Sequence, residues 1–113
     1  MTFDGGLAQR IRELLHDRGD VVEKRMFGGL AFMVGGHMTV GVSASSLLAR
    51  VGPANHAHAL ATAHVRPMDF TGRPMKGYVF VDPEGLASDG DLATWIRVCC
   101  DFVATLPARA PRR

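Results

Sequence analysis

The residues with the clearest capacity for chemistry lie in one segment, residues 65–81, with the sequence VRPMDFTGRPMKGYVFV. This segment brings three cations and one carboxylate close together: Arg66, Asp69, Arg73 and Lys76. An arginine presents a planar fork of N–H donors that matches a carboxylate or a phosphate. One interpretation is therefore a loop that binds an anion or a protein partner, with Asp69 orienting one of the arginines. Arg25, which shortly precedes a glycine pair, is a further candidate member of this group.

The same charges also have a purely structural interpretation. In it, Asp69 pairs with Arg66 or Arg73 and bonds to the loop backbone, because Asp-x-x-Gly is common turn chemistry. The two prolines of the segment favour extended backbone at the residues before them. The last four residues, Tyr78–Val81, are all aromatic or β-branched and predict a buried strand. Both interpretations thus place a charged loop in front of a strand.

Other chemistry has less support in the sequence. Gly28 and Gly29 are not followed by the Lys-Ser/Thr pair of a phosphate-binding loop, so they predict a bend. His56 and His58 are two residues apart in a predicted helix and point to different sides, so we expect them, like His64, to be solvated surface residues. No serine sits on a strand-to-helix elbow, and no carboxylates form a paired motif. We therefore expect no metal, no cofactor and no enzymatic activity.

The two cysteines, Cys99 and Cys100, are neighbours in an apolar, helical stretch. Adjacent residues rarely satisfy disulfide geometry, so we expect reduced core thiols in a cytoplasmic protein. The first ten residues lack the charged and apolar regions of a signal peptide. No apolar run approaches the length of about 20 residues that spans a membrane, so we expect no membrane association.

Hydrophobic periodicity and turn residues predict the order of the elements. A first helix from about residue 5 to 18 has Asp4 as its N-cap, and a last helix with Ser88 as its N-cap ends before Pro107. Between them we expect a meander of three strands, a short helix and one or two further strands: a region at 21–34 with a bend at the glycine pair, then 37–42, 47–51, the helix at 54–63, and 78–81. Gly35-Gly36 predicts a tight hairpin turn.

This order predicts an α+β fold, an antiparallel sheet with helices packed on one face and the sequence α-β-β-β-α-β-β-α. The other face of the sheet is also partly apolar, with Met26, Met33 and Met38 among its residues. Because an exposed apolar face is commonly an interface, we expect a homodimer.

The length of 113 residues suits one domain, which we place at residues 1–107, followed by a disordered basic tail at 108–113. The net charge is only +2, and three arginines lie in the tail. The folded body is therefore nearly neutral, which argues against specific nucleic-acid binding.

Three segments occur in order with tight spacing: KRMFGGLAFMVGGHMTVGV, LLARVGP and VRPMDFTGRPMKGYVFV. They resemble the TfoX N-terminal domain family, which includes the Sxy competence regulators, over about residues 10–105. The resemblance implies an α+β fold similar to the secretion-chaperone-like arrangement. Family members that regulate competence carry a second, helical C-terminal domain, whereas this sequence stops at Arg113. We therefore expect a stand-alone regulatory module that acts by protein–protein contact. The alternative is an anion or small-ligand binding domain that uses the Arg66–Lys76 loop.

Overall fold

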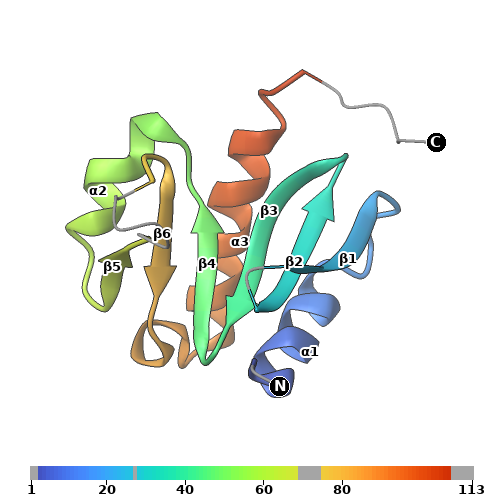
Figure 1. Ribbon diagram of the computed structural model, residues 1–113, viewed down its shortest axis with the longest axis horizontal. Coiled ribbons are helices and arrows are strands. Elements are labelled where there is room, and N and C mark those ends of the chain that lie inside the picture. The colour runs from blue at the N-terminus through green and yellow to red at the C-terminus, as the bar shows by residue number, and fades with distance from the viewer. Residues whose placement is uncertain (1–2, 27, 69–74, 108–113) are drawn as a thin grey trace.

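The computed structural model describes residues 3–26, 28–68 and 75–107. Three α-helices and two 3-10 turns accompany six strands: α1 (Gly5–Leu14), β1 (Val21–Met26), β2 (Gly29–Val34), β3 (His37–Ser43), β4 (Ser46–Arg50), η1 (Pro53–Asn55), α2 (His56–Leu60), β5 (Val65–Pro67), β6 (Tyr78–Val81), η2 (Pro83–Leu86) and α3 (Asp89–Val103). The strands form one sheet in the order β1-β2-β3-β4-β6-β5, and every neighbouring pair is antiparallel (Figure 1).

All three helices pack on one face of this sheet. Ile11 of α1, Ala59 of α2 and Ile96 of α3 belong to a single buried cluster together with Phe32 of β2 and Val81 of β6. Figure 1 shows α3 crossing the sheet behind β3 and β4. The predicted α+β class, with helices on one face and the 78–81 strand inside the sheet, is confirmed.

Two helices begin where the sequence places their caps. The Asp4 carboxylate accepts from the backbone N–H groups of Gly6 and Leu7, and the Ser88 hydroxyl accepts from that of Asp91. These bonds satisfy donors that the first helical turn leaves unpaired. None of the helices in the described part of the chain is both long and apolar enough to cross a lipid bilayer.

The region from residue 21 to 34 differs from the prediction of a single bent strand. It is a hairpin, because the chain reverses at Gly28 and β1 pairs with β2 from Val21↔Val34 to Met26↔Gly29. Gly28 has a φ of +69°, which glycine adopts without steric cost. The meander therefore has four strands before α2 rather than three.

The outer face of the sheet, away from the helices, also differs from the prediction of an exposed apolar surface. Its middle is a second small core in which Met68 is 0% exposed and packs with Ala31, Leu48 and Phe80. Met38 joins this core because the register shifts between β2 and β3, which turns Met38 away from Val40. Among the described residues of this face, the most exposed large apolar side chain lies at the β1–β2 end: that of Val22, which is 62% exposed.

Candidate functional site

The structure separates the residues that the sequence suggested as one site. Arg66 lies on β5 and Lys76 lies in the turn before β6, at one edge of the sheet. Arg25 lies on β1 at the opposite edge, five strand spacings or about 24 Å away. Its guanidinium sits 5.9 Å from the ring centroid of Phe3. Arg25 therefore does not join this group, and Asp69 and Arg73 lie outside the described residues.

The two ends of the connection between β5 and β6 are tied to each other and to the domain. The Met75 N–H donates to the Met68 carbonyl at 2.8 Å, and the Tyr78 N–H donates to the Met75 carbonyl at 3.1 Å. The Gly77 carbonyl accepts from the N–H groups of Val51 and Gly52 at 2.8 and 3.0 Å. We call residues 66–68 and 75–77 the loop stem. Because its backbone is held from several sides, it is a rigid base for the residues between.

His56 completes this attachment. Its Nδ1 accepts a hydrogen bond of 2.9 Å from the Gly77 N–H, so a neutral ring carries its proton on Nε2. The side chain is half-buried, which corrects the prediction of a solvated surface histidine. No local pattern of residue types predicts this contact, because 21 residues separate the two partners.

Arg66 of β5 bonds to Ser46 at the start of β4 and to Asp82, the residue that follows β6. Its Nε donates to Asp82 Oδ1 at 2.8 Å, and its Nη2 donates to Ser46 Oγ at 3.1 Å. Ser46 in turn donates to the same Asp82 oxygen at 3.1 Å. The guanidinium also lies 5.1 Å from the Phe80 ring centroid. Among the described residues, the carboxylate that pairs with Arg66 is therefore Asp82. The sequence suggested Asp69 for this role.

These hydrogen bonds set the protonation behaviour of Asp82. The hydrogen bond from Arg66, with smaller contributions from Ser46 and from the charges of Arg66 and His64, lowers the pKa of the Asp82 carboxyl. Desolvation opposes this shift, but it is the weaker effect. The cluster is thus a charge-assisted clamp that holds β4, β5 and β6 together at the sheet edge.

We predict that Asp82→Asn lowers the free energy of unfolding by about 0.5–1 kcal/mol at pH 7, the range for a partly exposed ion pair. A carboxylate whose pKa is lower in the folded state stabilises that state above its unfolded pKa of about 3.9. The contribution disappears as the pH falls through the folded pKa, which lies below the unfolded one, so wild type and variant should differ less in strong acid than at pH 7. Urea unfolding at both pH values measures this. An equal loss of stability at both pH values would contradict the ion pair between Arg66 and Asp82. The control is Glu84→Gln, because the Glu84 carboxylate is exposed.

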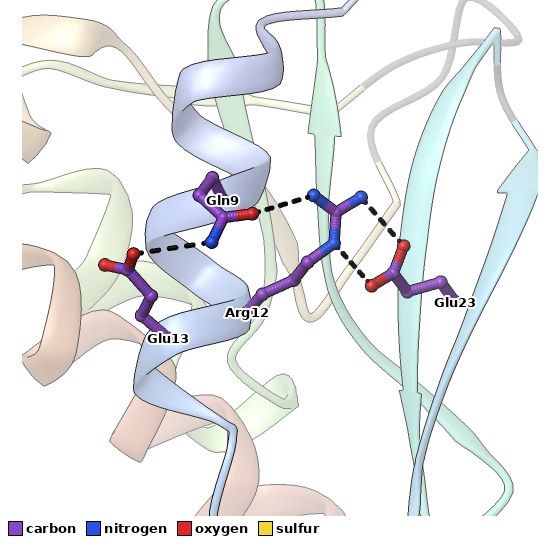
Figure 2. A network of polar contacts seen from close by, with 4 residues as sticks. All are labelled: Gln9, Arg12, Glu13 and Glu23. Atoms are coloured by element: carbon purple, nitrogen blue, oxygen red, sulfur yellow. Dashed lines mark hydrogen bonds and ion pairs between the residues drawn. The ribbon is translucent and has the colours of Figure 1, made fainter.

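A second group of charged and polar side chains joins α1 to β1. Arg12 donates to both Glu23 oxygens, from Nε at 2.6 Å and from Nη2 at 2.9 Å, and from Nη1 to Gln9 Oε1 at 3.2 Å (Figure 2). Gln9 donates to Glu13, at 3.3 Å. The hydrogen bond between Arg12 and Glu23 raises the pKa of the first and lowers that of the second. This network attaches α1 to β1, and its internal pairing gives it a structural role.

The thiols lie on the buried side of α3. Burial raises the pKa of Cys99 and, to a smaller extent, that of Cys100. A thiolate is the reactive form of cysteine, so both residues are poorly suited to act as nucleophiles. Both are free thiols, as the sequence predicts for core cysteines.

Comparison with known proteins agrees with the motifs in the sequence. The chain matches the family model described as TfoX N-terminal domain over residues 13–103, which span β1 to α3 and the loop stem. Searches of the curated proteins and of the solved structures find no match. Since the family model covers most of the chain, this protein belongs to the TfoX N-terminal domain family.

Proposed function

We propose that this domain is a regulatory protein-interaction module without catalytic activity, and that it forms a homodimer. The observation that carries the proposal is a row of side chains at the β1–β2 end of the outer sheet face that is apolar apart from Lys24, which lies between Val22 and Met26. Val22 is largely exposed there, and Met26 and Met33 are half-buried. A row of this kind is typical of an interface, and it continues the second core around Leu48 and Met68. A second copy would extend this core beyond what a domain of this size buries alone.

The contact with a partner protein is assigned to the β5–β6 connection. The backbone of its stem is fixed by the bonds at Met68 and Gly77, while two side chains of the stem, those of Met75 and Lys76, are exposed. A rigid base with an adaptable methionine and a cation suits protein recognition. The alternative of an anion-binding loop has less support, because Arg66 already directs Nε and Nη2 to Asp82 and Ser46.

We also propose a cytoplasmic location. The two cysteines support this location and the absence of catalysis. Cys99 and Cys100 are buried with raised pKa values, so the thiols are not poised for nucleophilic attack. They are also unpaired, which suits a reducing compartment.

The dimer has a direct test. We expect light scattering at about 100 µM protein to give twice the mass of one chain, since a dimer with a micromolar Kd is formed there. Val22→Lys should return the mass to that of a monomer, because the ammonium would be buried in the contact. Thr94→Lys, on exposed α3 surface, is the matched control and should stay dimeric. A wild-type protein that is monomeric at this concentration ends the dimer proposal.

Recognition through the loop is tested separately, by affinity capture from the native cell with tagged protein. Reversing the charges of Arg73 and Lys76 to glutamate should remove a partner that the wild type retains, because the cationic contacts become repulsive. Capture of the same proteins by both forms would count against the loop. The Val22→Lys variant, with its loop intact, separates loss of a partner from loss of the dimer.

A further inference from the structure

A hollow of about 590 Å³ lies between η1 and the second half of α3. Pro53 and Ala54 of η1 form one apolar wall, and Val98 and Phe102 of α3 form the other. We call this hollow the η1–α3 groove. Its residues differ from those of the proposed dimer surface and of the loop stem, so it is an independent feature.

The aromatic wall of the groove is held in place by its neighbours. The Phe102 ring lies directly against the backbone of Gly52, where a Cβ atom would come within 2.7 Å of Phe102 Cε1. The Arg50 guanidinium lies 5.6 Å from the centroid of the same ring and donates to the Met38 carbonyl at 3.2 Å. The groove is therefore preformed, and a ligand would not have to order this ring on binding.

The polar groups of the groove offer more acceptors than donors, because the second N–H of Asn55 Nδ2 is the one side-chain donor that its lining residues leave free. Asn55 uses Nδ2 to donate to the Val51 carbonyl, and Thr105 uses its hydroxyl to donate to the Phe102 carbonyl. Asp101 is exposed and makes no ion pair with another described residue. Arg97, one turn earlier on α3, is not paired with it. What remains for a ligand is an unneutralised carboxylate with acceptor oxygens beside an apolar wall.

This chemistry selects the kind of partner. A cationic side chain supplies positive charge and donors that match the oxygens of Asp101 and Asn55, and an adjacent aliphatic or aromatic side chain fills the space beside Phe102. Phosphate-rich ligands are disfavoured, because the groove carries the negative charge of Asp101 and offers them only the second N–H of Asn55. We propose that the η1–α3 groove binds a basic amphipathic segment of a partner protein, with an arginine or lysine on Asp101 and an apolar side chain between Phe102 and Pro53.

The single tryptophan gives a convenient signal. Trp95 lies on α3, three residues before Val98, and is half-buried. The probe is a synthetic helical peptide of about 15 residues, with leucine on one face and arginine beside it. Its counterpart carries glutamate at every arginine position. We expect the arginine peptide to change the Trp95 emission with a Kd on the order of 10 µM, at least tenfold tighter than the glutamate peptide.

Variants assign the signal to the groove. Asp101→Asn should weaken the arginine peptide about fivefold and reduce its preference over the glutamate peptide. Thr105→Arg, which places a cation in the groove at an exposed position, should weaken it at least tenfold. Glu84→Gln, an exposed carboxylate elsewhere, should leave the Kd unchanged. All three positions are exposed, so we expect each variant to fold, and circular dichroism checks that it does.

Several outcomes would overturn the proposal. Equal binding of the two peptides, or variants that bind as the wild type does, would remove the cationic partner. If residues 1–107 alone bind the peptide at least tenfold more tightly than the full chain, the occupant is the chain's own segment with Arg109, Arg112 and Arg113. If Thr105→Arg instead converts a dimer to a monomer, the groove belongs to a contact between copies.

Discussion

Gly52→Ala is expected to lower the free energy of unfolding by about 2–6 kcal/mol. Gly52 has a φ of +91° and a ψ of 155°, a backbone region that glycine alone adopts readily and that costs a residue with a Cβ about 1–3 kcal/mol. The added methyl group would also lie 2.7 and 2.8 Å from Phe102 Cε1 and Cγ, closer than carbon atoms pack. Moving the ring would cost a further 1–3 kcal/mol or so. Urea unfolding followed by far-ultraviolet circular dichroism measures the sum.

A double-mutant cycle separates the two costs. In a Phe102→Ala background the ring is gone, so adding Gly52→Ala should cost only the backbone contribution of about 1–3 kcal/mol. Gly19→Ala is the matched control, because Gly19 has no neighbouring atom within 4 Å of the added Cβ and no positive φ. If Gly52→Ala costs no more than Gly19→Ala, the close packing of Phe102 on Gly52 is absent in solution.

The N-termini of the first and last helices and the tight turn at Gly35-Gly36 could be predicted because their causes are local, whereas the first helix ends at Leu14 and not near the predicted residue 18. The Asp4 carboxylate accepts from backbone N–H groups within the next three residues. Both turn glycines have positive φ, at 60° and 86°, which is the geometry that a two-residue hairpin requires. Features of this kind are encoded within a few residues, so the pattern of residue types was sufficient to find them.

The chain reversal at Gly28 and the β-bulge at Thr39 could not be predicted from a local pattern of residue types. A glycine pair between two apolar stretches suits a bend and a hairpin equally, and β1 has the charged sequence Glu23-Lys24-Arg25 that is typical of an edge strand. Strict alternation would place Met38 on the face of Val40 and Val42. The register shift next to Thr39 moves Met38 to the opposite face. Strand pairing, which depends on distant residues, decides both cases.

The candidate site shows the same division between local and distant causes. The sequence identified the charged segment, and Arg66 and Lys76 do lie at the ends of one connection. It could not identify Asp82 and Ser46 as the partners of Arg66, because they meet only when β4, β5 and β6 are aligned. The contact between His56 and Gly77 has the same origin, since η1 and α2 must first bring the ring to the loop stem.

Met68 provides the sharpest test of the second core on the outer sheet face. The sequence places Met68 and Met75 in the same loop, where both could be exposed, yet Met68 is 0% exposed and Met75 is 37% exposed. We predict that Met68→Ala lowers the free energy of unfolding by about 2–4 kcal/mol, the cost of removing a fully buried methionine side chain. Urea unfolding with an unchanged m-value would show that the loss is one of stability.

Met75→Ala is the matched control, because the two methionines share a backbone hydrogen bond of 2.8 Å that neither substitution removes. Its cost should stay below about 1 kcal/mol, since a side chain that is 37% exposed gains less from packing than a fully buried one. A similar cost at both positions would mean that Met68 does not pack on Leu48 and Phe80 in solution. The middle of the outer face would then be as open as its β1–β2 end, and a dimer could cover the whole face rather than the row at Val22.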